Sequence, residues 1–396
     1  MRDPVPVSDE AATLCNQGGG AHSGKSSPDS PTIHVTRPYL PPLDELLPLL
    51  EEIWDGRWLT NHGPFHQRFE QALAQFLEVE HVSLTANGML ALETAVEASA
   101  LSGEIITTPY SFVATTHAIK RAGLMPVFVD IRGSDLNIDV DRIEERITDR
   151  TSAIVAVHCY GNPCDGEKLK RIADRHGLKL IYDAAHAFGV RQFGKSVLTW
   201  GDFSILSFHA TKAFNTFEGG AVITRSAEGK AAVDNLGNFG IADEVTVRTV
   251  GGNAKMNEFS AALGLVQLVH FEEARAGRSR VDARYREALS GVTGIEPIEI
   301  APGVEPNFSY FPVLVTADYP ISRDDLYELL KRNGIYSRRY FYPLLSSLPM
   351  YRDLPSAAPD NLPVATRAAE QILCLPIYHD LGDGDQDRVI DLIRTA

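Results

Sequence analysis

The sequence predicts an α/β protein, with a large domain built on a mostly parallel sheet covered by helices and a smaller C-terminal α+β domain. Between Val82 and Thr224, short apolar β-branched runs alternate with helix-like segments, the pattern of right-handed βαβ units. These runs are apolar throughout rather than alternating with polar residues, so both faces of the sheet should be covered. The chain has 396 residues, more than the ~250–300 that one hydrophobic core usually organises.

The expected elements follow from these patterns in chain order. Ordered structure should begin near Ile33, and the spacing of apolar residues predicts a helix over Phe65–Leu77. A turn at Asn87-Gly88 separates a short strand, Val82–Leu84, from the next helix. The other predicted strands are Ile105–Thr107, Val127–Val129, Ala153–Val157, Leu178–Tyr182, Ser204–Phe208, Ala221–Thr224 and Tyr310–Val315. The other predicted helices are Ser111–Arg121, Val140–Ile147, Glu167–His176, Asn257–Tyr285 and Arg323–Arg332.

Changes in composition divide the chain into three parts. Residues 1–32 contain Gly18-Gly19-Gly20 and Ser26-Ser27-Pro28, which predict a flexible tail, and they lack the basic start and apolar stretch of a signal peptide. Residues 33–251 form the predicted large domain. The strand–helix alternation ends near Gly252, so residues 252–396 are the predicted small domain.

The charge balance and the cysteines exclude several classes of partner. The formal net charge is -15, from 52 acidic and 37 basic residues, and an acidic surface repels nucleic acids and anionic membranes. No run approaches the ~20 apolar residues of a membrane span. Of Cys15, Cys159, Cys164 and Cys374, one C-x4-C pair lacks a second pair to complete a zinc site. We expect buried thiols in a reducing cytoplasm, and no metal site.

Asp183 is the first candidate functional residue. It ends the apolar run Leu180-Ile181-Tyr182, and ligands of parallel α/β sheets bind beyond the carboxyl ends of the strands. The small residues Ala184 and Ala185 leave room for a flat ligand. An aspartate at such a junction is also a common helix N-cap, and position alone does not decide between the two roles.

Lys212 is the second candidate. Most lysines are surface charges, but this one follows a buried-looking strand and lies between Ser207 and the flexible pair Gly219-Gly220. Desolvation would lower the pKa of the amine and make it nucleophilic, as a Schiff base requires. With Asp183 upstream, these residues indicate pyridoxal phosphate, which needs an amine for its aldehyde, a carboxylate for its pyridine nitrogen and donors for its phosphate.

The turn Asn87-Gly88-Met89 is the candidate phosphate site. It joins a short strand to a helix, whose free N–H groups would bind a phosphate. Gly88 would let the backbone approach closely. On its own, a glycine at such a place is usually only a turn.

The ordered set of motifs resembles the sugar-nucleotide aminotransferases of the DegT/DnrJ/EryC/StrS type. The main segments are Asp183–His186, Ser207–Lys212 and Glu218–Gly220. Further similar segments are Leu59–Pro64, Pro109–Thr115, His158–Gly161, Gly252–Met256 and Leu375–Tyr378, so the resemblance covers residues 33–396. It implies a fold-type I, pyridoxal-phosphate-dependent transferase.

The resemblance implies a role for each matched residue around the cofactor ring. Lys212 would form the Schiff base and shuttle the proton, and Asp183 would keep the pyridine nitrogen protonated. His186 would lie beside the phenolic oxygen and Phe112 would stack on the ring face. Because related sugar 3-dehydratases carry a histidine in place of this lysine, Lys212 implies a transaminase. His209, three residues earlier, would be a supporting residue of the cofactor site.

The resemblance also implies a phosphate cup and a second subunit. Ser207 would bind the phosphate together with the Asn87–Met89 turn, where Met89 replaces the threonine usual in the family. Asn253 would reach the phosphate of the neighbouring subunit's cofactor, which implies a homodimer with shared active sites. Lys255 stands where the family usually has an arginine.

The substrate contacts are harder to place. Arg338, Arg339 and Tyr340 lie in a loop where family members often have a histidine, and they are candidate substrate contacts. Together with Arg121, these arginines could recognise the carboxylate of the amino donor or the diphosphate of the nucleotide, because the guanidinium binds both in a bidentate manner.

The resemblance is greatest to enzymes that aminate C4 of a dTDP-4-keto-6-deoxyhexose. We expect conversion of dTDP-4-keto-6-deoxy-D-glucose to the 4-amino-4,6-dideoxy sugar, with L-glutamate as amino donor, for an antibiotic or a surface glycan. The alternatives are C3 amination of a dTDP-3-keto-6-deoxyhexose and a non-catalytic regulatory protein that binds pyridoxal phosphate.

Overall fold

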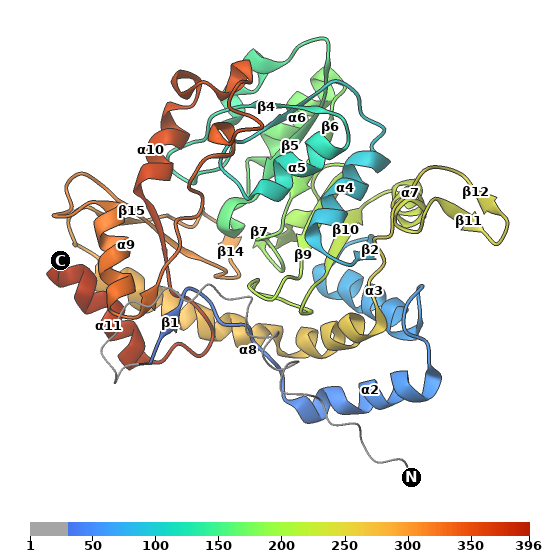
Figure 1. The fold of residues 1–396 in the computed structure, drawn as a ribbon, viewed down its shortest axis with the longest axis horizontal. Coiled ribbons are helices and arrows are strands. Elements are labelled where there is room, and N and C mark those ends of the chain that lie inside the picture. The colour runs from blue at the N-terminus through green and yellow to red at the C-terminus, as the bar shows by residue number, and fades with distance from the viewer. Residues whose placement is uncertain (1–30) are drawn as a thin grey trace, which may run out of the picture.

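A seven-stranded sheet forms the centre of the molecule in a computed structural model that describes residues 31–396 (Figure 1). The predicted tail therefore lies, for residues 1–30, outside the described residues. Neighbouring strands pair in parallel except β10, which is antiparallel to both of its neighbours. In sheet order the strands are β2 (His81–Thr85), β10 (Gly220–Thr224), β9 (Phe203–Ser207), β6 (Lys179–Asp183), β5 (Thr151–Val157), β3 (Glu104–Thr107) and β4 (Met125–Phe128).

Helices cover both faces of this sheet, as the apolar strands predicted. Adjacent residues of β3 show the division, since Ile105 belongs to the core on one face and Ile106 to the core on the other. On the Ile105 side lie α4 (Gly88–Ala98), α5 (Val113–Arg121) and α7 (Ala227–Gly237), and on the opposite side lies α6 (Gly166–His176). Near β2 and β10 the cover is made by α3 (Pro64–Leu77) and α8 (Glu258–Leu289).

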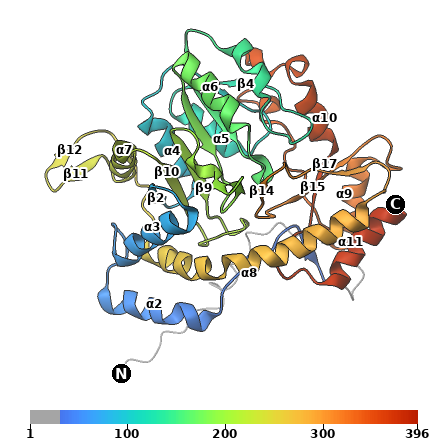
Figure 2. The same cartoon turned by 180° about the vertical axis from the view of Figure 1, so that it is seen from behind.

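The 32-residue helix α8 connects the two ends of the molecule. It packs against α3 and α2 (Leu43–Gly56) near its start and against α11 (Asp383–Thr395) near its end (Figures 1 and 2). Asn257 fixes the first turn of α8, because its side chain accepts a hydrogen bond from the Ser260 amide at 2.9 Å.

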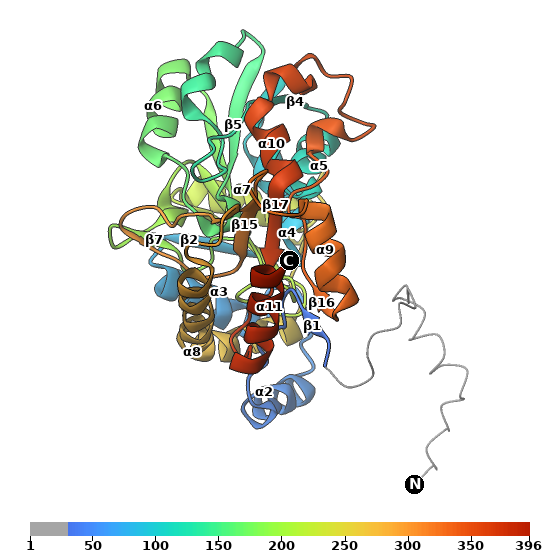
Figure 3. The ribbon, with the colours of Figure 1, turned by 90° about the vertical axis from the view of Figure 1, so that its left-hand side faces the viewer.

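The C-terminal part is built on a three-stranded antiparallel sheet. Its strands are β13 (Ile295–Pro297), β15 (Phe311–Val315) and β17 (Ile372–Leu375), accompanied by α9 (Arg323–Arg332), α10 (Pro363–Gln371) and α11 (Figure 3). This is the α+β composition expected for the smaller domain. The boundary near residue 252 stays a prediction.

Short strand pairs complete the architecture. They are β1 (Ile33–His34) with β16 (Ile335–Tyr336), β11 (Ile241–Asp243) with β12 (Thr246–Val247), and β14 (Val304–Glu305) with β7 (Arg191–Gln192) and β8 (Lys195–Ser196). The β11–β12 hairpin projects from the body beside α7 (Figures 1 and 2). Within residues 31–396, none of the helices is long and apolar enough to cross a membrane.

One predicted helix is wrong. Val140–Ile147 forms two successive 3₁₀ turns, Val140–Arg142 and Glu144–Arg146, instead of an α-helix. Its bonds span three residues, as in the Arg146 amide to the Ile143 carbonyl at 2.9 Å. The burial of Val140 and Ile143 against the sheet accounts for the apolar spacing, and that spacing alone does not distinguish a short 3₁₀ run from an α-helix.

Candidate active site

A pocket of about 960 Å³ opens at the edge of the sheet where the parallel strands end. Residues that follow β2, β3, β6 and β9 line it, and Tyr310, Tyr340 and Phe341 from the C-terminal part close one side. Ten predicted site residues line this pocket: Asn87, Gly88, Met89, Phe112, Asp183, His186, Ser207, His209, Lys212 and Tyr340. The carboxyl edge of the sheet therefore brings together groups that are up to 253 residues apart in the sequence, counting from Asn87 to Tyr340.

Lys212 lies in the loop after β9, which is held at both ends. Phe208 donates its N–H to the Gly219 carbonyl at 2.8 Å, and the Lys212 amide donates to the His209 carbonyl at 2.9 Å. The Lys212 Nζ lies 3.4 Å from the hydroxyl of Tyr310. Burial lowers the pKa of this amine to about 8, against the opposing effect of the Asp183 charge. The lysine is thus less costly to deprotonate than an exposed one.

Asp183 is buried at the end of β6. One carboxylate oxygen accepts the Thr115 hydroxyl at 2.7 Å, and the other accepts the Ala185 amide at 3.2 Å. Burial raises the pKa of this carboxyl, while these two hydrogen bonds and Lys212 act in the opposite direction. A protonated ring nitrogen would supply the countercharge that a buried carboxylate needs.

The turn before α4 forms a cradle for an anion. The Asn87 side chain caps α4 by accepting the Leu90 amide at 2.9 Å, while the amides of Gly88 and Met89 have no backbone partner within residues 31–396. A Cβ added to Gly88 would lie 2.7 Å from the Ser207 Cβ, so a side chain here would fill the cradle. Free amides at a helix N-terminus bind phosphate.

His186 is held in a defined orientation in the pocket. Its Nδ1 accepts the Tyr160 amide at 3.2 Å, and its ring stacks on Phe341 with centroids 5.8 Å apart. Burial lowers the pKa of His186 well below its usual range, with Lys212 contributing. The neutral ring then carries its proton on Nε2, which becomes a donor. Phe112, the N-cap of α5, lines the pocket and is 58% exposed.

Three predicted site residues lie outside the lining of the pocket. Asn253 is exposed and pairs with Asn238 beside the β11–β12 hairpin. Arg338 is exposed, and its backbone pairs with Cys374. Arg339 donates to Asp324 at 2.6 Å and lies over the ring of Tyr327. Within this chain the two arginines therefore serve the C-terminal part.

Sequence reasoning missed two groups at the pocket. Thr115 contacts Asp183 and Tyr310 contacts Lys212, and the sequence patterns indicated neither contact. Thr115 lies four residues after Ser111, one turn along the predicted helix, which was an available signal. Arg121, a candidate anion contact, lines the pocket and pairs with Glu93.

These groups fit pyridoxal phosphate. Lys212 offers the amine, Asp183 the carboxylate, and the Asn87–Met89 turn with Ser207 offers donors for a phosphate. The space beside Gly88 that a side chain would fill is the observation that fits the phosphate best.

Comparisons with known proteins agree with this chemistry. Residues 44–394 match the model of the DegT/DnrJ/EryC1/StrS aminotransferase family. A dTDP-4-amino-4,6-dideoxy-D-glucose transaminase of Escherichia coli is 53% identical over 356 residues, covering 89% of this chain and 95% of the relative. A protein of the same name from Shigella dysenteriae is 49% identical, covering 91% and 98%.

More distant and structural relatives follow the same pattern. A dTDP-3-amino-3,4,6-trideoxy-alpha-D-glucose transaminase of Micromonospora megalomicea subsp. nigra is 33% identical, covering 84% of this chain and 90% of that relative. The crystal structure of DesI in the presence of its TDP-sugar product superposes with a TM-score of 0.88 at 39% identity, covering 92% of this chain and 93% of that one.

Proposed function

Because the chain belongs to the DegT/DnrJ/EryC1/StrS aminotransferase family, we propose that it transfers the amino group of L-glutamate to C4 of dTDP-4-keto-6-deoxy-D-glucose. The chain is a pyridoxal-phosphate-dependent sugar aminotransferase. The products would be dTDP-4-amino-4,6-dideoxy-D-glucose and 2-oxoglutarate. The observation that carries the proposal is the desolvated Lys212 amine and the buried Asp183 carboxylate in one pocket.

The residues of this chain divide the work in the proposed reaction. Bound pyridoxal phosphate supplies an electron sink for the carbon that loses its proton. Lys212 would attach the cofactor and, once its amine is free, move a proton from Cα of the amino donor. Asp183 would hold the proton on the ring nitrogen, and the Nε2–H of His186 would donate to the phenolic oxygen. The Gly88 and Met89 amides would hold the phosphate away from the reacting atoms.

Relatives support C4 rather than C3 as the site of amination. The two bacterial relatives named for the 4-amino sugar are far more similar to this chain than the relative named for a 3-amino sugar. A hydrophobic or polar contact alone changes sugar preference by only a few kcal/mol. The choice between C4 and C3 is therefore best tested with both keto sugars.

A homodimer and a cytoplasmic location complete the proposal. Asn253, exposed beside a projecting hairpin, would contact a second subunit. Cys159, Cys164 and Cys374 are buried free thiols, which suit a reducing compartment.

An absorbance titration tests the proposed function. The holoenzyme should show a band near ~420 nm that moves to near ~330 nm when L-glutamate is added, because the amino group passes to the cofactor. Adding dTDP-4-keto-6-deoxy-D-glucose should then restore the first band and yield the amino sugar. Turnover of the 3-keto isomer alone would replace C4 by C3 amination. A band that yields no amino sugar from either ketone would favour the regulatory protein.

A further inference from the structure

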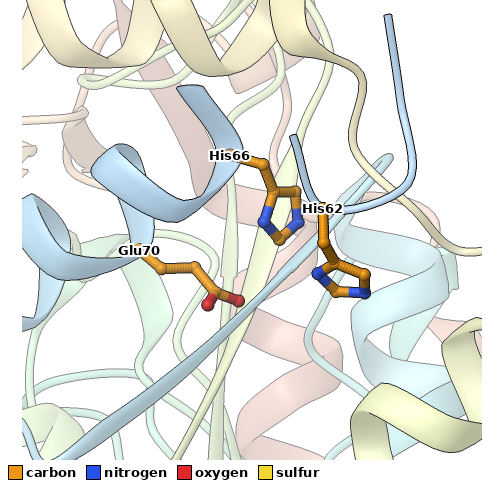
Figure 4. A group of neighbouring side chains, drawn as sticks. All are labelled: His62, His66 and Glu70. Carbon is orange, nitrogen blue, oxygen red and sulfur yellow. The ribbon is translucent and has the colours of Figure 1, made fainter. Parts of the chain in front are cut away.

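Three side chains that commonly bind metals lie together at the start of α3, away from the pocket (Figure 4). His62, His66 and Glu70 are spaced by four residues, so the turn and the helix set them on one side. Their ligand atoms all lie within 4.8 Å of one another. The two imidazole rings meet edge to face with centroids 4.5 Å apart.

His66 has buried polar atoms that its surroundings leave unsatisfied. The residue is 1% exposed, and neither ring nitrogen has a hydrogen-bond partner within residues 31–396. Buried ring nitrogens normally have a partner, and one without any needs an explanation. Burial lowers the pKa of His66 to about 3, so the ring keeps a free lone pair. A ligand that accepts this lone pair would satisfy the ring.

The backbone around the cluster is fixed before any ligand arrives. The buried carboxylate of Glu258 accepts the amides of Phe65 and His66 at 2.8 and 3.0 Å, which ties the first turn of α3 to α8. Gly63 leaves the space for that carboxylate, since a Cβ there would lie 2.6 Å from the Glu258 Cδ. His62 has a left-handed φ of 54°, which fixes the direction of its side chain toward the helix.

A lysine competes for the carboxylate but does not depend on it. The Lys230 Nζ lies 3.3 Å from Glu70. The same ammonium also donates to the Val82 carbonyl at 2.7 Å and pairs with Asp234 at 3.1 Å. Lys230 therefore keeps two acceptors when Glu70 turns to another cation.

We propose that His62, His66 and Glu70 bind one divalent transition-metal ion, best matched by zinc, with water as the fourth ligand. Two imidazoles and a carboxylate bind zinc at about 2.0–2.2 Å, so tetrahedral ligands lie about 3.4 Å apart and the three side chains must close by about 1 Å. Glu70 also accepts the Leu84 amide of β2 at 3.3 Å, and β2 leads directly into the Asn87–Met89 turn. The ion would join α3 to the strand that precedes the phosphate cradle. This proposal revises the expectation of no metal site.

Zinc binding to the full-length holoenzyme tests the proposal. After treatment with a chelator and gel filtration, the protein is titrated with zinc chloride in competition with a chromophoric chelator. We expect one zinc ion per chain. His62→Asn and Glu70→Gln should each weaken the affinity at least ~10-fold, because even outer-shell partners of a metal change affinity by about 10–100-fold. Asn tolerates the left-handed backbone at position 62, so this variant should fold.

His270→Gln is the matched control. His270 also pairs with glutamates, Glu45 and Glu273, but lies elsewhere on the molecule. Its removal should leave zinc affinity unchanged, and zinc should raise the melting temperature of this variant and of the parent but not of His62→Asn. Zinc affinity equal in the parent, His62→Asn and Glu70→Gln would overturn the proposal, as would a parent that retains no zinc. Amino transfer measured without zinc reports on the proposed function separately.

Discussion

Two opposing effects set the reactivity of Lys212. Burial lowers the pKa of the amine to about 8, and the negative charge of Asp183 acts to raise it. Only the neutral amine attacks an aldehyde. Uptake of pyridoxal phosphate by cofactor-free protein should therefore speed up as the pH rises through about 8 and level off above it, which stopped-flow absorbance would measure.

Asp183→Asn tests the sign of this argument. Loss of the carboxylate charge removes the effect that raises the lysine pKa, so the midpoint should move to lower pH. Asp202→Asn, at an exposed ion pair with Lys179, should leave the midpoint unchanged. Uptake that is flat through about pH 8, or a midpoint that rises in Asp183→Asn, would contradict the assignment.

Single residues also mark how far the sequence could predict the pocket. Lys212 and Asp183 could be predicted because each follows an apolar strand, and parallel strands end at one edge. Tyr310, the partner of Lys212, lies 98 residues further along the chain. Its approach depends on how the C-terminal part packs, which no local pattern contains. The four-residue spacing of His62, His66 and Glu70 is visible in the sequence, but such spacing on a helix is too common to indicate a metal site by itself.

The elements were predicted well where burial sets the pattern. Strands β3, β5, β6, β9 and β10 agree within about two residues with their apolar runs. Prediction was wrong for Val140–Ile147, where the segment makes i→i+3 bonds instead of an α-helix. Such short segments follow their tertiary contacts more than their own sequence.

The start of α3 depends on a side chain from α8. Glu258 accepts two backbone amides there while fully buried. Glu258→Ala should lower the free energy of unfolding by about 1–3 kcal/mol, because two buried donors lose their acceptor. Glu272→Ala removes a more exposed carboxylate of the same helix, which pairs with Arg275, and should change it by less than about 0.5 kcal/mol. Urea unfolding measures both, and equal losses would show that Glu258 does not hold α3.

At the scale of the molecule, large apolar side chains are exposed around the projecting hairpin. Val245 is 90% exposed and Val250 is 93% exposed, and Trp54 of α2 is 68% exposed. Soluble monomers rarely leave such side chains grouped and uncovered. A second copy of the chain is the partner that also accounts for Asn253, which follows the same hairpin in the sequence.

Static light scattering should therefore give the holoenzyme a mass twice the 43.4 kDa of one chain. Val245→Asp combined with Val250→Asp would place two buried charges in the proposed interface, and this variant should scatter as a single chain with unchanged far-ultraviolet circular dichroism. Its amino transfer should fall because Asn253 no longer reaches the neighbouring cofactor site. Met350→Asp, at an exposed apolar residue outside the hairpin and α2, should keep the double mass. A holoenzyme of single-chain mass, or a double variant that stays dimeric, would show that the hairpin does not join two subunits.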